Sequence, residues 1–192
     1  MRAIDVANFF VDLSGKSDDN DLTKMKLIKL VYFAQALHLA KNKTPLFDEE
    51  IQAWDYGPVI PSVFHEFSTY QREIIDKTTD SYDSSCFTSE DIDFLTDIEM
   101  NYGKFSAIEL SRQSHVKGGP WERVYRKGLN AVIPKDMMAE YYSDKPFKTF
   151  RINMSNIKPV GRRDKDGHLV LPAEMYSPED DVYDEMYAKC RT

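Results

Sequence analysis

The sequence has 192 residues, of which 42% are hydrophobic and 12% aromatic, and its formal net charge is −7. This length and composition predict one folded domain with a small appendage and exclude a disordered chain. A net negative charge argues against a protein that binds nucleic acid directly through a broad basic face. The only cysteines, Cys86 and Cys190, are far apart in sequence, so we expect neither a disulfide framework nor a zinc site.

The first fifteen residues, MRAIDVANFFVDLSG, carry two acidic residues and no long apolar run. They predict neither a signal peptide nor a membrane span, so we expect a cytoplasmic protein without a membrane partner. Apolar residues in this segment follow the i, i+3, i+4, i+7 spacing of an amphipathic helix, at Ala3, Val6, Ala7 and Phe10. Ser14 and Gly15 end this helix.

Residues 21–41, DLTKMKLIKLVYFAQALHLAK, give the strongest helix signal, because they contain neither glycine nor proline. Apolar residues cover more than one face of this helix, which is typical of a helix buried at the centre of a domain. We expect Lys24, Lys26 and Lys29 to face solvent in its first turns.

Residues 50–58 predict a short extended corner. A strand-like run that ends at Trp54 meets the residues DYGP, in which Gly57 supplies a permissive backbone angle. Pro61 then takes the first position of a helix that runs to about Tyr70, because proline needs no hydrogen-bond partner there. The chain is therefore expected to bend at this corner from an extended segment into a helix packed against the central helix.

Short helices are expected between residues 88 and 142, each with its own start and stop signals. The first begins at the capping residue Thr88 and ends at Gly103, the second opens with the capping box Ser106–Glu109, the third runs from Pro120 to Gly128, and the last runs from Ile133-Pro134 to about Tyr142.

The character of the sequence changes after Lys145. Apolar residues alternate loosely there, and Asp166-Gly167 is a hairpin-type turn signal. We therefore predict a helical domain over residues 1–145 and a C-terminal extension over residues 146–192, made of a small β-hairpin and an acidic tail. The predicted fold class is mainly α, a compact helical domain around one long central helix.

Catalytic and metal-binding motifs are absent from the sequence, and no cofactor or metal is expected. The four histidines show no metal-ligand spacing, and neither a phosphate-binding loop nor a nucleophile motif occurs. We expect His38 and His115 to be structural and bonded to nearby backbone. The alternative is a hydrolase that uses His38, His115 and a carboxylate such as Asp55, which requires these side chains to meet in an open cleft.

Three sequence blocks occur in an order and at a spacing that resemble one family. They are LTKMKLIKLVYFAQALH at 22–38, PLFDEEIQAWDYGPVIP at 45–61, and the separated residues Tyr102-Gly103, Ser106-Ala107, Leu110-Ser111, His115 and Pro120-Trp121. Together they resemble the Panacea antitoxin domain, the SocA-like and phage GepA-like family, over about residues 1–142. The chain departs from the family pattern at two positions: the family often has glutamine where this chain has Ile28, and tryptophan where it has Leu37. The loop at Gly118-Gly119 also differs from the family pattern.

The resemblance implies a mostly helical domain without catalytic activity, whose members neutralise toxins of different kinds by direct protein–protein contact. It implies a cognate toxin as the partner, often encoded by the neighbouring gene, and the family is common in prophages. One branch delivers its toxin to a protease as an adaptor, and the resemblance does not choose between this role and sequestration. The oligomeric state also stays open. Structural roles are expected for Gln35, His38, Ser106, His115, Pro120 and Trp121.

The first half of the central helix and the corner are expected to border one partner-binding surface. Aromatic residues held on a rigid corner make good interface anchors, because they lose little side-chain entropy on binding. The residues expected at this surface are Lys26, Lys29, Tyr32, Trp54, Tyr56, Gly57 and Pro58.

Overall fold

The computed structural model describes residues 1–149 except 17–19, 71 and 81, together with the strand residues 162–163 and 169–170. The chain divides into two units, residues 1–150 and 151–192, and each is described by itself. In the second unit, β4 (Arg162–Arg163) pairs antiparallel with β5 (Leu169–Val170), with Arg162 opposite Val170. This pairing confirms the predicted hairpin, while the predicted acidic tail lies outside the described residues.

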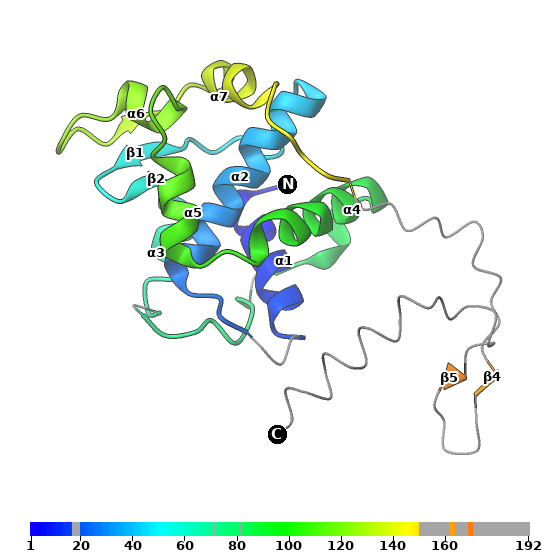
Figure 1. Cartoon of the computed structure of the whole chain (residues 1–192). Coiled ribbons are helices and arrows are strands. Elements are labelled where there is room, and N and C mark those ends of the chain that lie inside the picture. Colours follow the sequence, from blue (N-terminus) through cyan, green and yellow to red (C-terminus); the bar gives the residue numbers. More distant parts are fainter. Residues whose placement is uncertain (17–19, 71, 81, 150–161, 164–168, 171–192) are drawn as a thin grey trace, which may run out of the picture. The chain divides into compact units, whose positions relative to one another are not determined.

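The first unit is mainly helical, as predicted, and Figure 1 shows its helices arranged around α2. Its α-helices are α1 (Ala3–Ser14), α2 (Lys24–Asn42), α3 (Pro61–Glu66), α4 (Ser89–Ile98), α5 (Ala107–Ser114), α6 (Pro120–Val124) and α7 (Lys135–Tyr142). A 3-10 turn spans Ser84–Cys86, and a π-helix, Glu99–Gly103, continues α4.

Helix α2 is the central helix of the unit, and every residue from Lys26 to Leu37 is buried. It packs against α7, α1 and α5. The side chain of Thr23 caps its N-terminus by accepting from the backbone N–H of Lys26 at 3.4 Å, so the helix starts three residues later than predicted. Lys43 follows its last turn with a left-handed φ of 60°.

The predicted corner is a tight β-hairpin with a third strand beside it. Strand β1 (Gln52–Trp54) lies between β2 (Gly57–Val59) and β3 (Ala131–Val132), and both pairings are antiparallel. We call residues 52–59 the hairpin corner. Pro58 lies on the edge strand β2, where its missing N–H costs no ladder hydrogen bond. The sequence did not predict β3, because two residues give too short a pattern.

The other helix ends follow the predictions with small shifts. The capping box of α5 is confirmed: the Ser106 N–H donates to Glu109 Oε2 at 2.8 Å, and the Glu109 N–H donates to Ser106 Oγ at 3.3 Å. Helix α3 ends at Glu66, before the predicted Tyr70, and α6 ends at Val124, before Gly128.

Candidate partner-binding site

Lys29 connects the central helix to the hairpin corner. Its Nζ donates to the carbonyl oxygen of Tyr56 at 2.7 Å and to that of Pro58 at 3.1 Å. The residue is only 2% exposed, and this burial lowers the pKa of Lys29 to about 7. Two backbone carbonyls therefore replace the water that a lysine side chain normally keeps, and they fix the turn of the hairpin to α2.

Gly57 is required where Lys29 meets the turn. Its φ of 103° lies in a region that side chains disfavour. A Cβ atom at this position would lie 2.5 Å from Lys29 Nζ and 2.7 Å from His115 Cε1. The missing side chain thus allows α2 and the end of α5 to approach the hairpin together.

His115 and Trp121 attach the third sequence block to the corner. His115 Nδ1 donates to the carbonyl oxygen of Ser111 at 2.5 Å, and its ring lies 4.0 Å from that of Trp121, centre to centre. Burial, and then the charge of Lys29, lower the pKa of His115. The indole N–H of Trp121 donates to the carbonyl oxygen of Trp54 at 2.9 Å. The start of α6 is therefore bound to β1.

The base of the corner is held by aromatic packing and one more hydrogen bond. The Tyr125 hydroxyl donates to Asp55 Oδ1 at 2.9 Å, and the ring of Trp54 packs on that of Phe64 in α3 at 5.0 Å. Lys24 Nζ lies 4.4 Å above the ring of Phe64. Of these residues, Phe64 was not singled out in the sequence, because its partners come from other elements.

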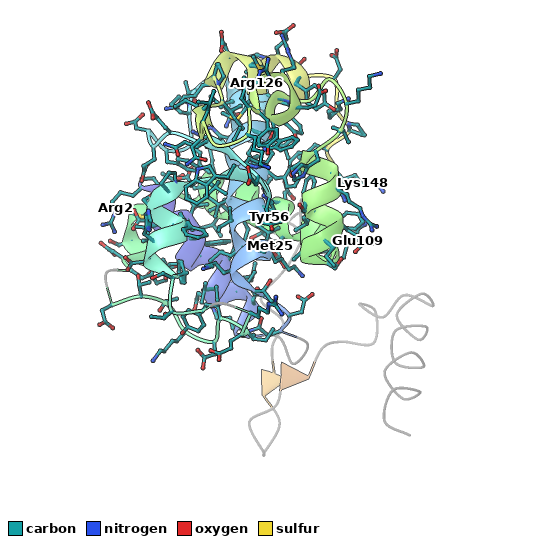
Figure 2. All side chains as sticks on the ribbon, turned by 90° about the vertical axis from the view of Figure 1, so that its left-hand side faces the viewer. Arg2, Met25, Tyr56, Glu109, Arg126 and Lys148 are labelled. Atoms are coloured by element: carbon teal, nitrogen blue, oxygen red, sulfur yellow. The ribbon has the colours of Figure 1, made fainter. Side chains whose placement is uncertain are left out.

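Tyr56 is the exposed residue at the tip of the corner. It is 76% exposed, and its side chain makes no hydrogen bond or ring contact within the described part of the chain. In Figure 2 it is labelled on the same face as Met25, whose side chain is also partly exposed one helical turn before Lys29. Trp54 is half-buried. The turn therefore presents one aromatic side chain to solvent on a backbone that is held from below.

The prediction that Lys26 and Lys29 face solvent is wrong. Lys26 is buried and donates to Asp21 Oδ1 at 2.5 Å, and Lys29 is buried by the hairpin. Tyr32 is fully buried as well, with its hydroxyl 3.3 Å from that of Tyr142. These three residues are buried, as are Gly57 and Pro58, so Tyr56 and the half-buried Trp54 are the expected contact residues that reach the surface.

Gln35 and His38 attach the segment that follows α2. Gln35 is buried, donates to the carbonyl oxygen of Phe47 at 2.7 Å, and accepts from the backbone N–H groups of Leu46 and Phe47 at 2.8 and 3.3 Å. His38 Nδ1 donates to the carbonyl oxygen of Thr44 at 2.8 Å. Both side chains form hydrogen bonds with backbone groups of the loop before the corner.

The arrangement required by the hydrolase alternative is not found. His38 follows Lys29 by nine residues on α2, which is about 14 Å along the helix axis, whereas His115 lies beside Lys29. Asp55 instead accepts from Tyr125. Among the described residues, no three histidine, cysteine or acidic side chains are placed to hold a metal ion.

The family model for "Antitoxin SocA-like, Panacea domain" matches residues 27–122, half of the chain. The chain belongs to the SocA-like Panacea family. The match begins within α2 and ends at the start of α6, so it includes Lys29, the hairpin corner, and His115 and Trp121.

One curated Panacea relative is Antitoxin SocA of Caulobacter vibrioides (strain NA1000 / CB15N), which is 31% identical over 126 residues. The alignment covers 61% of this chain and 66% of that relative, just under two thirds of its length. No solved structure matches the chain. None of the helices in the described residues has the length and apolar character needed to cross a membrane.

Proposed function

We propose that this Panacea protein is an antitoxin that neutralises a toxin protein by direct contact and without catalysis. The family match and the similarity to Antitoxin SocA support the antitoxin role. The toxin is proposed to be the product of an adjacent gene, and the complex to form in the cytoplasm.

The observation that carries the contact proposal is the exposure of Tyr56 on a fixed turn. A side chain that is already held above a rigid backbone loses little conformational freedom when a partner covers it. Lys29, Gly57 and the Trp121 hydrogen bond fix that backbone, and 76% of Tyr56 is free to be covered. Tyrosine is also enriched among the residues that dominate binding energies at interfaces. We therefore propose that Tyr56 inserts into the toxin surface, with Trp54 at the margin of the contact.

Co-expression tests this proposal. The product of the adjacent reading frame is expressed alone and together with the tagged protein, growth is scored, and the two proteins are then co-purified. The proposal predicts growth arrest by the neighbour alone, rescue on co-expression, and a complex that survives purification. A harmless neighbour, or rescue without any complex, would count against direct neutralisation of that protein.

The same experiment separates sequestration from delivery to a protease. Toxin levels are followed after synthesis is stopped, in a host with and without its ATP-dependent proteases. Sequestration leaves a stable toxin inside the complex. An adaptor instead lowers the toxin level only where the proteases are present.

A further inference from the structure

Strand β3 forms an open edge of the three-stranded sheet, on the side of β1 opposite to β2. Val132 lies opposite Gln52, and the next residue, Ile133, donates its backbone N–H to the carbonyl oxygen of Ile51 at 2.7 Å. Hydrogen-bonded and non-hydrogen-bonded residue pairs alternate along an antiparallel ladder. The N–H and C=O groups of Val132 therefore point away from β1, toward the open edge of the sheet.

The pairing on the other side of β1 agrees with this alternation. Ala53 lies opposite Pro58, which has no N–H, so the hydrogen-bonding groups of Ala53 are directed to Ala131 in β3. Among the described residues, the backbone groups of Val132 have no hydrogen-bond partner. Val132 is 42% exposed, so these groups bond to water until another chain displaces it.

The segment that leads to this edge is basic. Residues 123–135, RVYRKGLNAVIPK, contain four basic residues and no acidic residue, although the whole chain has a net charge of −7. Arg123, Arg126 and Lys127 are exposed, and none of the ion pairs within the described part of the chain includes them. Asp55 contacts this segment, but its Oδ1 already accepts from a tyrosine hydroxyl there. Three cationic side chains are therefore available to a partner.

A defined turn places apolar side chains beside these charges. The Leu129 N–H donates to the carbonyl oxygen of Arg126 at 3.1 Å, and Gly128 and Asn130 have left-handed φ angles of 78° and 46°. Leu129 is 69% exposed. Figure 1 shows the segment between α6 and α7 beside β1, and Figure 2 labels Arg126 on it. The turn thus presents charged and apolar side chains next to an unpaired strand edge.

We propose that this edge binds an extended, acidic segment of a partner protein, which adds a fourth strand to the sheet beside β3. The backbone of the partner pairs with the N–H and C=O groups of Val132, and its carboxylates pair with the three cationic side chains. Strand β3 has only two residues, and Pro134 offers no N–H beyond it, so the partner strand extends toward the basic turn. The proposal does not depend on the antitoxin function.

Two other occupants fit this surface less well. A second copy of the chain would place another basic segment beside this one, and like charges on paired strands repel. A nucleic acid could neutralise the charges but has no peptide groups to pair with a strand edge. Nucleic acids also bind by stacking bases on aromatic rings, and the ring of Tyr125 already stacks on that of Trp121 at 4.4 Å. The open edge and the exposed Leu129 therefore favour a peptide segment.

Titration by NMR spectroscopy tests the surface on the ¹⁵N-labelled full-length protein. The probe is the capped peptide Ac-EVEVEVEV-NH₂, in which acidic and apolar side chains alternate, and the amide signals of residues 129–133 are followed. We expect saturable shifts of these signals and slower hydrogen exchange of the Val132 amide, which gains a hydrogen-bond partner. The basic counterpart Ac-KVKVKVKV-NH₂ should leave the signals in place. No shifts, or equal shifts with the two peptides, would overturn the proposal.

A modified peptide separates strand addition from charge attraction alone. N-methylation of two successive central residues of the acidic peptide blocks both of its edges and keeps its charge. Binding should then weaken about tenfold or more, because the backbone hydrogen bonds to β3 are lost. Equal affinity of the methylated and unmethylated peptides would contradict strand addition.

Charge-reversal variants test the basic turn. The double variant Arg126→Glu/Lys127→Glu should lose binding of the acidic peptide, while Arg72→Glu/Lys77→Glu, which reverses two exposed charges between α3 and α4, should keep it. Equal affinities of the two folded variants would overturn the role of the turn. Oligothymidylate is the last probe, and tighter binding of this nucleic acid than of the acidic peptide would overturn the assignment to a protein partner.

Discussion

Lys29 Nζ lies 2.7 Å from the carbonyl oxygen of Tyr56, so a buried lysine supports the most exposed aromatic residue of the hairpin corner from below. The two residues belong to different sequence blocks of the family pattern. This contact gives one physical reason why those blocks occur together: the first supplies the donor, the second supplies the turn, and the third closes over both through His115 and Trp121.

Replacement of Lys29 should change how stability depends on pH. The pKa of Lys29 is lowered from 10.5 to about 7 in the folded protein, so between these values the unfolded chain binds more protons. The free energy of unfolding of the parent protein should therefore rise with pH from about 7 to 10.5, by up to about 1.4 kcal/mol per pH unit from this group. Lys29→Met should lose this contribution. Urea unfolding at pH 6.5, 8 and 9.5 measures it, and parallel curves for the two proteins would contradict the lowered pKa.

Gly57→Ala should destabilise the protein by more than left-handed strain alone. That strain costs about 1–2 kcal/mol, and the new methyl group would also displace Lys29 Nζ and the ring of His115. Gly128→Ala is the matched control, because Gly128 has φ 78° with no atom within 4 Å of the added Cβ. Thermal unfolding of both variants should show the larger loss at position 57. Equal losses would mean that the close approach around Gly57 contributes nothing.

Gln35→Leu should cost about 2–4 kcal/mol, because the change leaves buried backbone groups of Leu46 and Phe47 without partners. Gln52→Leu is the control: this half-buried side chain accepts one hydrogen bond, from Trp54 Nε1, and its loss should cost about 1 kcal/mol or less. Denaturant unfolding compares the two variants. A smaller loss at position 35 than at position 52 would refute the bridging role given to Gln35.

The sequence was sufficient to predict those helices whose start signals are local. The capping residues Thr88 and Ser106 and the first-turn prolines Pro61 and Pro120 mark helix starts that depend on neighbours within one turn. The apolar residues of α2 likewise predict burial without knowledge of what covers them. Such features do not depend on contacts with distant parts of the chain.

The environment of the lysines could not be predicted in the same way. Lys26 and Lys29 lie in a run of lysines that is typical of a solvated helix face. Lys29 is nevertheless buried because carbonyl groups 27 and 29 residues later in the chain replace its water. Strand β3 depends equally on a distant partner, β1, about 80 residues earlier. Only the folded arrangement reveals such pairings.

Tyr56→Ala should weaken toxin binding while leaving the fold intact. Tyr56 is 76% exposed and makes no side-chain hydrogen bond in the described residues, so its removal should change the free energy of unfolding by less than about 0.5 kcal/mol. If Tyr56 anchors the interface, its removal should weaken the binding free energy by at least about 2 kcal/mol, which raises Kd about thirtyfold. Ile92→Ala is the control, since Ile92 is 43% exposed but lies on α4. Equal affinities of the two variants for the toxin would mean that Tyr56 is not part of the contact.

Calorimetric titration of the purified protein with the purified product of the adjacent toxic gene tests direct binding most directly. We expect a saturable complex of the two proteins with no other component present, weakened by Tyr56→Ala and unaffected by Ile92→Ala. Growth rescue in cells combined with no detectable heat or complex between the purified proteins would contradict it.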